Sequence, residues 1–285
     1  MSRQPETTFD MSEPADYRAL DRRAFLVIKN GLTFACRFVI TPGADRLVVI
    51  PESWADRSKG PPLLFHRWSW GPRMNAHILS ISDPTLFLDD ELISACFLGH
   101  WLRDPMPILA EIAAWFASSM KLGAEDWLFY GASAGGFAAM RAAALIPNGR
   151  AIVVNAFLEL DCFDGRHLSA RIAKVFGANM SLAEVKKVVP FRASAIAALR
   201  DAYTAGRKPR IIVAQNTNDG ACYHNHFQPL CRAFDIPLDG GIDSRHRAIK
   251  AVPVDWADGH SDGAEGTTEW LFATQVPWLF ERVPA

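Results

Sequence analysis

The chain has 285 residues, of which 49% are hydrophobic and 21% are charged, a composition typical of a protein with a sizeable buried core. Its formal net charge is −1, without a long run of one sign, so the charge pattern does not indicate binding to nucleic acid or to an anionic membrane. No stretch approaches about 18 uninterrupted apolar residues, which argues against a membrane span.

The first 20 residues mix proline with acidic and basic residues, and we expect residues 1–20 to form a flexible arm ahead of one domain over 21–285. This start has no apolar segment of the kind found in signal peptides. The five cysteines are an odd number without a Cys-x-x-Cys pair, which is typical of reduced thiols. These features predict a cytoplasmic protein.

Eight short apolar runs are predicted strands. The first two lie on either side of Gly31-Leu32 and are expected to form an antiparallel hairpin at the edge of a sheet. The other six are bounded by Pro, Gly or Asp and alternate with helical stretches, a pattern typical of a parallel sheet covered on both faces. The runs are AFLVIKN (24–30), FACRFVI (34–40), RLVVI (46–50), HILSI (77–81), WLFY (127–130), AIVVNAF (151–157), RIIVAQN (210–216) and KAVPVDW (250–256).

Helices are predicted over 105–122, where apolar residues recur near helical spacing, over 135–146 and over 267–283. The interval 160–208 holds two or three further helical stretches and no convincing strand, and Ser-Leu-Ala-Glu at 181–184 has the spacing of a capping box. The predicted fold is therefore α/β, with a mostly parallel central sheet, helices on both faces, and 160–208 as a helical cap insertion. Such an insertion is expected over the carboxyl ends of the strands, where ligands bind.

The stretch FYGASAGGF at 129–137 contains the pattern G-x-S-x-G, with Ser133 at its centre. A predicted strand precedes the pattern and a predicted helix follows it, which is the context that a nucleophile elbow requires. In such an elbow the glycines let strand and helix pack closely, while the serine is held in a strained conformation above the sheet edge. The alternative is that the glycines serve packing alone and that Ser133 caps the helix.

A serine hydroxyl is a poor nucleophile without a base, and an elbow predicts an acid after a later strand and a histidine after the last one. Asp219 follows the run 210–216, and His260 follows the run 250–256. The order Ser133, Asp219, His260 is the one that the elbow predicts.

With these residues the chain resembles the α/β-hydrolase superfamily over roughly residues 25–283. More loosely, FYGASAGGFAAM is similar to a group of bacterial hydrolase-like proteins with Tyr-Gly-x-Ser-x-Gly-Gly, some of which are linked to acyl transfer on glycans. The resemblance implies acyl transfer, with Ser133 as nucleophile, His260 as general base and Asp219 orienting the imidazole. Two alternatives stay open: some lipase-like members of the superfamily place the acid where Asp161 stands, and His246 is a second candidate for the base.

The resemblance also implies an oxyanion hole formed by the backbone N–H of Ala134 and by a loop after an earlier strand. In this chain LVVIPESW (47–54) replaces the His-Gly-Gly run of many lipases. Pro51 has no N–H to donate, so Ser53 or Trp54 is the predicted second donor.

Substrate contacts are predicted from FHRWSWGPR at 65–73, where Arg67, Trp68 and Trp70 are candidates to stack on a sugar or to bind an acidic group. His100 is a further candidate for the pocket. The alternative is that the tryptophans belong to the core and that Arg67 makes a structural ion pair.

The segment DGACYHNHF (219–227) groups an aspartate, a cysteine and two histidines, but no second ligand cluster has the spacing of a zinc site. We therefore expect no metal, and a helix after Asp219 would turn His224 and His226 to different sides. The glycines of 131–136 lack both the dinucleotide spacing and the Walker lysine, so we expect no nucleotide cofactor.

The predicted function is a serine hydrolase that cleaves a carboxylic ester, thioester or related acyl bond of a small-molecule or glycan-linked substrate. An O-acyltransferase acting on a glycan and a serine peptidase would use the same machinery. A catalytically silent hydrolase-like binding protein is the third alternative, and the complete Ser-Asp-His order disfavours it.

Overall fold

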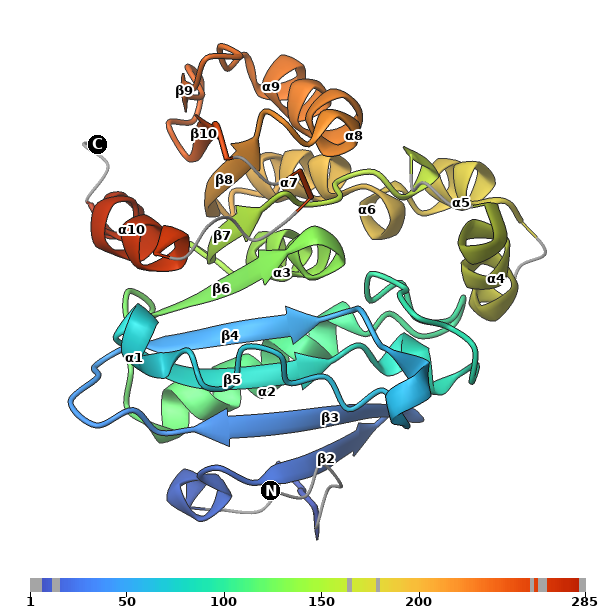
Figure 1. Cartoon of the computed structure of the whole chain (residues 1–285), viewed down its shortest axis with the longest axis vertical. Helices are drawn as coiled ribbons and strands as arrows, with labels where there is room; N and C mark the ends of the chain where they lie inside the picture. Colours follow the sequence, from blue (N-terminus) through green and yellow to red (C-terminus); the bar gives the residue numbers. More distant parts are fainter. Residues whose placement is uncertain are drawn as a thin grey trace.

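The computed structural model describes residues 7–11, 16–162, 166–177, 180–256, 259–260 and 266–281. Its centre is a ten-stranded mixed sheet in the order β1-β2-β3-β5-β4-β6-β7-β8-β10-β9 (Figure 1). The strands are β1 Thr7–Thr8, β2 Ala24–Lys29, β3 Leu32–Val39, β4 Leu47–Glu52, β5 His77–Ser82, β6 Trp127–Ala132, β7 Arg150–Val154, β8 Arg210–Asn216, β9 Gly241–Ile242 and β10 Ile249–Val254.

The six strands from β5 to β10 in this order run parallel, and the antiparallel pairs lie toward the edges, at β2–β3, β3–β5 and β10–β9. All eight predicted runs coincide with strands, and the predicted hairpin is β2–β3. The fold class predicted from the sequence is therefore confirmed. The two strands that the sequence did not indicate, β1 and β9, have two residues each.

Helices cover both faces of the sheet (Figure 1). The helices are α1 Gly71–Met74, α2 Met106–Ser119, α3 Ser133–Leu145, α4 Arg166–Phe176, α5 Leu182–Val188, α6 Pro190–Ala193, α7 Ala195–Thr204, α8 Gly220–Cys222, α9 Gln228–Phe234, α10 Thr267–Thr274 and α11 Val276–Phe280. None of the helices among the described residues has the length and hydropathy needed to cross a bilayer.

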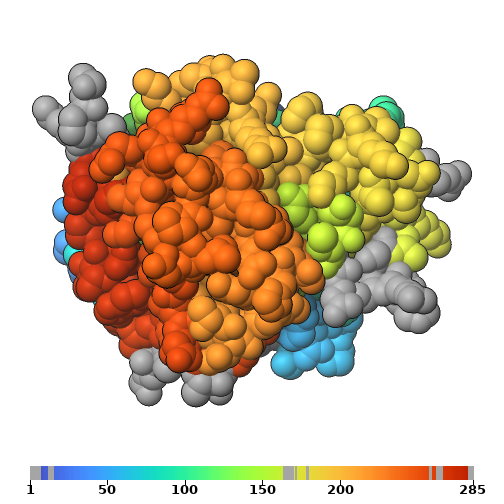
Figure 2. Space-filling view, turned by 90° about the horizontal axis from the view of Figure 1, so that it is seen from above, coloured from blue at the N-terminus to red at the C-terminus, as the bar shows by residue number. Residues whose placement is uncertain are grey.

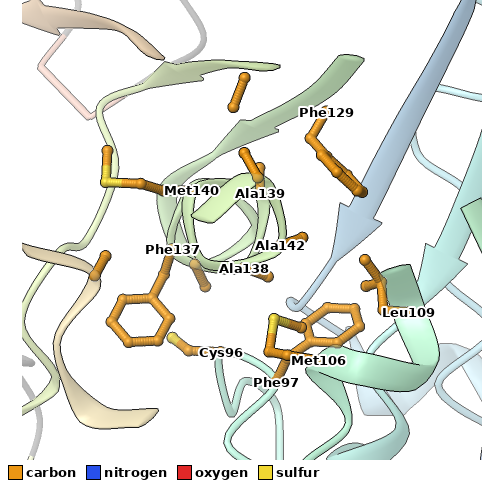
Figure 3. Packing of buried hydrophobic residues seen from close by; sticks show 14 of the residues in the cluster. Cys96, Phe97, Met106, Leu109, Phe129, Phe137, Ala138, Ala139, Met140 and Ala142 are labelled. Atoms are coloured by element: carbon orange, nitrogen blue, oxygen red, sulfur yellow. The ribbon is translucent and has the colours of Figure 1, made fainter. Parts of the chain in front are cut away.

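Two large apolar clusters form most of the core, one on each side of the central strands. Alternation along β6 assigns its side chains: Phe129 belongs to the cluster under α2, α3 and α7, whereas Leu128 and Tyr130 belong to the one under α10 and α11. Figure 3 shows α3 end-on in the first cluster, with Ala138, Ala139 and Ala142 on its surface and larger side chains packed around them. Small residues on α3 let this helix lie close to the sheet, which fixes the position of its first residue.

The described part of the first twenty residues packs against the domain, whereas we expected a flexible arm. β1 pairs in parallel with β2, and Phe9 packs edge-on against Phe25 and Trp115, with ring centroids 5.7 and 4.8 Å away. Tyr17 packs edge-on against Phe38 at 6.0 Å. The prediction rested on the number of proline and charged residues in this segment. Its aromatic side chains nevertheless bury enough apolar surface to hold it against the sheet.

The interval 160–208 is helical throughout its described residues outside short turns, and it contains α4 to α7. α5 begins with the predicted capping box, in which Ser181 Oγ accepts the backbone N–H of Glu184 and the Glu184 carboxylate accepts that of Ser181. α7 packs on α3 as the crossover helix between β7 and β8, so this helix belongs to the layer that covers the sheet. In Figure 2, α5–α7 (yellow) lie beside the orange segment that includes α9. The function of 160–208 as a cap stays a prediction.

Candidate active site

Ser133 lies at the junction between β6 and α3, which places it at the carboxyl end of a central strand. Its φ of +53° is in the left-handed region, which is strained for a residue with a side chain. The glycines on either side permit the sharp junction. A Cβ on Gly131 would lie 2.3 Å from the carbonyl oxygen of Gly135, and a Cβ on Gly135 would lie 2.4 Å from that of Pro51. The packing and the strained serine therefore belong to one arrangement.

The structure brings Ser133, His260 and Asp219 into a continuous chain of contacts. His260 Nε2 lies 2.9 Å from Ser133 Oγ, and His260 Nδ1 lies 2.6 Å from Asp219 Oδ2. Asp219 is buried, with a side chain 6% exposed, whereas the imidazole is 43% exposed. Phe157 stacks on the imidazole, with ring centroids 5.5 Å apart and planes 11° from parallel. These contacts hold the imidazole between a buried carboxylate and an accessible hydroxyl.

Asparagine side chains tie the loop that carries His260 to the sheet. Asn216, the last residue of β8, donates from Nδ2 to the carbonyl oxygen of Gly259 at 2.8 Å and accepts the backbone N–H of Trp256 at 3.0 Å. The Asn216 backbone N–H in turn donates to Asn155 Oδ1 at 2.7 Å. The two chain segments that follow β7 and β8 therefore position the loop after β10.

Asp219 is held in its ionised form by the groups around it. Burial raises the pKa of this carboxyl, but hydrogen bonds from His260 and from the backbone N–H and thiol of Cys222 outweigh burial and hold the pKa below its usual value. The backbone N–H of Cys222 donates at 3.2 Å, since Asp219 is the N-cap residue of α8. An ionised carboxylate at this position can orient the imidazole and stabilise its cation.

One group of metal-ligand type occurs among the described residues, and it involves the same side chains. A carboxylate oxygen of Asp219, the sulfur of Cys222 and a ring nitrogen of His260 lie within 4.8 Å of one another. Burial raises the pKa of the Cys222 thiol, which favours its protonated form. The two histidines considered in the sequence, His224 and His226, are not part of this group: the first is exposed and the second is buried.

A pocket of about 600 Å³ opens beside Ser133. Seven of the residues singled out from the sequence line it, namely Ser53, Trp54, Arg67, Trp70, Ser133, Ala134 and His260. The sequence did not indicate six others, which are Glu52, His66, Ile93, Ser94, Asn155 and Phe157. Aromatic rings and one ion pair, between Glu52 and Arg67, thus surround the candidate nucleophile.

Ser53 and Trp54 differ in what they offer to this pocket. The Ser53 hydroxyl is buried and fully engaged, because it donates to Asp83 Oδ2 at 2.6 Å and accepts the backbone N–H groups of Ala95 and Cys96 at 3.3 and 2.7 Å. Trp54 is exposed at the rim, and the His66 ring contacts its carbonyl oxygen at 3.2 Å. Among the described residues, none accepts a hydrogen bond from the backbone N–H of Ser53 or Trp54.

Two predicted pocket residues lie elsewhere. Trp68 does not line the pocket, because it packs under the guanidinium of Arg37, which lies 4.3 Å from its ring centroid. Arg67 and Trp70 are three positions apart in a helical turn and share a face, and Trp68 falls between them on the other side. His100 belongs to the loop before α2, where Arg192 donates to its carbonyl oxygen at 2.8 Å.

The alternative acid and base are also placed away from Ser133 Oγ. Asp161 is exposed and pairs with Lys186, with Nζ 2.9 Å from Oδ1. His246 precedes β10 instead of following it, and its ring stacks on Tyr203 at 4.4 Å. The contacts with Ser133 and with His260 are thus made by the residues first predicted.

Neither a protein-family model nor a curated protein sequence matches the chain. Solved structures are similar to it. A glycosylation-associated protein complex (Gap123) from Streptococcus agalactiae has a TM-score of 0.62 at 15% identity, over 88% of this chain and 45% of that one, so this chain spans less than half of it. The capsule O-acetyltransferase of Neisseria meningitidis serogroup A has a TM-score of 0.61 at 14% identity, over 88% and 96% of the two chains. An esterase from Rhizomucor miehei has a TM-score of 0.52 at 14% identity, over 90% and 82%. The likeness shows the α/β-hydrolase type of fold.

Proposed function

We propose that this chain is a serine hydrolase that cleaves a carboxylic ester, a thioester or a related acyl bond through an acyl-enzyme on Ser133. The observation that supports this most directly is the pair of contacts at His260, 2.9 Å from Nε2 to Ser133 Oγ and 2.6 Å from Nδ1 to Asp219 Oδ2. A hydroxyl, an imidazole and a buried carboxylate in this sequence of contacts are the elements of nucleophilic acyl transfer.

The steps follow from these positions. Ser133 Oγ attacks the carbonyl carbon while His260 Nε2 takes the hydroxyl proton, and Asp219 stabilises the imidazolium that forms. The imidazolium then gives this proton to the leaving alcohol or thiol, and the acyl group stays on Oγ. In the second half, Nε2 takes a proton from water, the water oxygen attacks the acyl carbon, and Oγ regains a proton as the acid is released.

The negative oxygen of the tetrahedral intermediate needs hydrogen-bond donors. Ala134 is the second residue of α3, so its backbone N–H is one of the helix-terminal groups without an intrahelical acceptor. It faces the carbonyl oxygen of the substrate from the positive end of the helix dipole. The second donor is the backbone N–H of Ser53 or Trp54, in the loop after β4. The hydroxyl of Ser53 is not available for this purpose, because it donates its hydrogen bond to Asp83.

An O-acyltransferase acting on a glycan is the second candidate. It is favoured by the likeness to the capsule O-acetyltransferase, which extends over 96% of that chain. The two activities share the acyl-enzyme and differ in whether water or a sugar hydroxyl accepts the acyl group. Measuring the acid and the acylated sugar formed from one acyl ester, with and without an added sugar acceptor, separates them.

A fluorophosphonate probe, which reacts with activated serines, tests the nucleophile. We expect it to label the wild-type chain once, and Ser133→Ala to abolish labelling because the hydroxyl that contacts His260 is gone. Ser94→Ala is the matched control, since Ser94 lines the same pocket and is expected to leave labelling intact. Labelling that persists in Ser133→Ala would disprove the assignment of the nucleophile.

A further inference from the structure

An ion pair with little access to solvent forms part of the wall of the Ser133 pocket. Glu52 Oε2 lies 3.1 Å from Arg67 Nη1, and the backbone N–H of Arg67 donates to Glu52 Oε1 at 3.3 Å. The two side chains are 5% and 14% exposed, and both residues line the pocket. Burying such a pair adds little to stability, because desolvation offsets the attraction. The two side chains therefore place two opposite charges in the wall of the pocket that also holds Ser133.

The charges of this pair select for one kind of substrate group. A carboxylate or phosphate that approaches Arg67 is repelled by the carboxylate of Glu52. A cation that approaches Glu52 is repelled by the guanidinium of Arg67. A hydroxyl avoids both, because it donates its proton to Glu52 and accepts a hydrogen bond from the guanidinium. Neighbouring hydroxyls on one ring can contact both side chains at once. The pair is therefore complementary to a neutral group with several hydroxyls.

Aromatic side chains stand beside the pair in the same pocket. The guanidinium of Arg67 lies 5.3 Å from the ring centroid of Trp70, and Trp54 at the rim is 55% exposed. The rings of Trp54 and His66 are 6.0 Å apart. Flat apolar faces are complementary to the C–H faces of a sugar ring, whose hydroxyls point outward from its edge. A pocket of about 600 Å³ has room for such a ring next to an acyl group.

From this arrangement we infer that the alcohol part of the substrate is a neutral sugar or a similar polyol, bound by Glu52 and Arg67 through its hydroxyls and by the tryptophans through its ring. Ser133 then attacks the carbonyl of an acyl group that this sugar carries. The inference rests on the proposed acyl transfer at Ser133, and it adds the chemical class of the alcohol and the two side chains that select it.

Two acetate esters of the same shape provide the test, methyl 6-O-acetylglucopyranoside and cyclohexylmethyl acetate. Both carry the acetate on a methylene attached to a six-membered ring, and only the first has ring hydroxyls. The measured quantity is the ratio of their kcat/KM values for alcohol release, in wild type and in Glu52→Gln. We expect wild type to prefer the sugar ester and Glu52→Gln to lower the ratio by about 3- to 10-fold, because glutamine still accepts a hydrogen bond from a hydroxyl but lacks the charge that makes this bond about twice as strong.

Glu159→Gln is the control, because the Glu159 side chain is also little exposed, at 10%, and pairs with Lys186, but it does not line the pocket. This control is expected to leave the ratio as in wild type. If Glu52→Gln does not fold, Arg67→Lys takes its place, since lysine keeps the charge but lacks the planar fork, and the same ratio is expected to fall.

Three results would overturn the inference: a wild type without preference for the sugar ester, an unchanged ratio in Glu52→Gln, or stronger inhibition by methyl glucuronoside than by methyl glucoside. The second result would leave the ion pair a structural link between β4 and the turn at Arg67. Failure of the proposed function gives a different result. In that case neither ester releases alcohol faster with wild type than with Ser133→Ala.

Discussion

Asp219 illustrates how one residue combines burial with ionisation. Burial alone would favour the neutral acid, but the hydrogen bonds from His260 and Cys222 make the carboxylate the stable form. A carboxylate that is already ionised and oriented can stabilise the imidazolium without any rearrangement. Asp161, in contrast, is exposed and paired with a lysine, so it offers no such support to a histidine.

Substituting the two aspartates separates these roles. Asp219→Asn keeps the side-chain shape but removes the negative charge and favours the wrong imidazole tautomer, so we expect kcat/KM for an activated ester to fall by about 10³- to 10⁴-fold. Asp161→Asn removes an exposed ion pair and is expected to change the same constant by less than about threefold. A larger loss in Asp161→Asn than in Asp219→Asn would reverse the assignment of the acid.

At the scale of elements, the junction of β6 and α3 depends on how closely α3 approaches β4 and the segment after β7. A Cβ on Gly136 would lie 2.6 Å from the Cβ of Ala156, and one on Gly135 would lie 2.4 Å from the backbone of Pro51. Backbone atoms cannot move aside as a flexible side chain can. Pro51 is the next-to-last residue of β4, and the loop that holds the proposed oxyanion donors begins after Glu52, so α3 packs against the strand end that carries this loop.

Gly135→Ala is expected to destabilise the chain and to misplace Ser133. The added methyl group meets the carbonyl oxygen of Pro51, and overpacking of this kind costs about 1–3 kcal/mol of unfolding free energy. Urea unfolding measures this loss, and the rate of fluorophosphonate labelling measures the displacement of Ser133. Gly220→Ala serves as the control for stability, since a Cβ there would have no neighbour within 4 Å, and equal losses in the two variants would contradict the packing argument.

The sequence predicted those features that local pattern determines. Apolar runs located eight strands, and the glycine spacing with its flanking strand and helix located the junction at Ser133. In irregular segments no repeating pattern of apolar residues tells which way a side chain points, so these directions could not be predicted. Trp68 lies between two pocket residues and faces away, because the chain there forms a helical turn instead of a strand.

Phe157 was missed for a related reason. The run 151–157 resembles one continuous strand, but β7 ends at Val154 and Asn155 has a φ of +43°, which turns the chain. The turn carries Phe157 onto the imidazole of His260. An asparagine after an apolar run is a signal for such a turn, because asparagine adopts the left-handed region more readily than most residues.

For the whole molecule, the sheet brings together residues that are far apart in the chain. Parallel strands present their carboxyl ends at one edge, so the segments after β4, β6, β7, β8 and β10 all contribute to one pocket or to the contacts at Ser133. The short strand β1 lies at the end of the sheet next to β2, and the aromatic contacts of Phe9 hold it there. Stability and site geometry therefore depend on the same sheet, and a buried group near the site affects the stability of the whole chain.

His226 is such a group, and it predicts how the unfolding free energy depends on pH. It is buried beside Phe157, and among the described residues its Nδ1 has no hydrogen-bond partner. Burial lowers the pKa of this histidine from 6.5 to about 4, against the opposing influence of Asp219 and Asp161. Between these two pH values the unfolded chain takes up a proton that the folded chain does not, so stability falls as pH falls through this window.

Replacing this histidine should flatten that dependence. Between about pH 7 and pH 4.5, we expect wild type to lose about 2 to 3 kcal/mol more unfolding free energy than His226→Phe, measured by urea unfolding at both pH values. Asp219, whose pKa is lowered in the fold, adds its own loss only at still more acidic pH. The control is His224→Phe, at an exposed position of the same turn, which is expected to keep the wild-type dependence. Equal losses in wild type and His226→Phe would mean that His226 is protonated in the folded chain despite its burial.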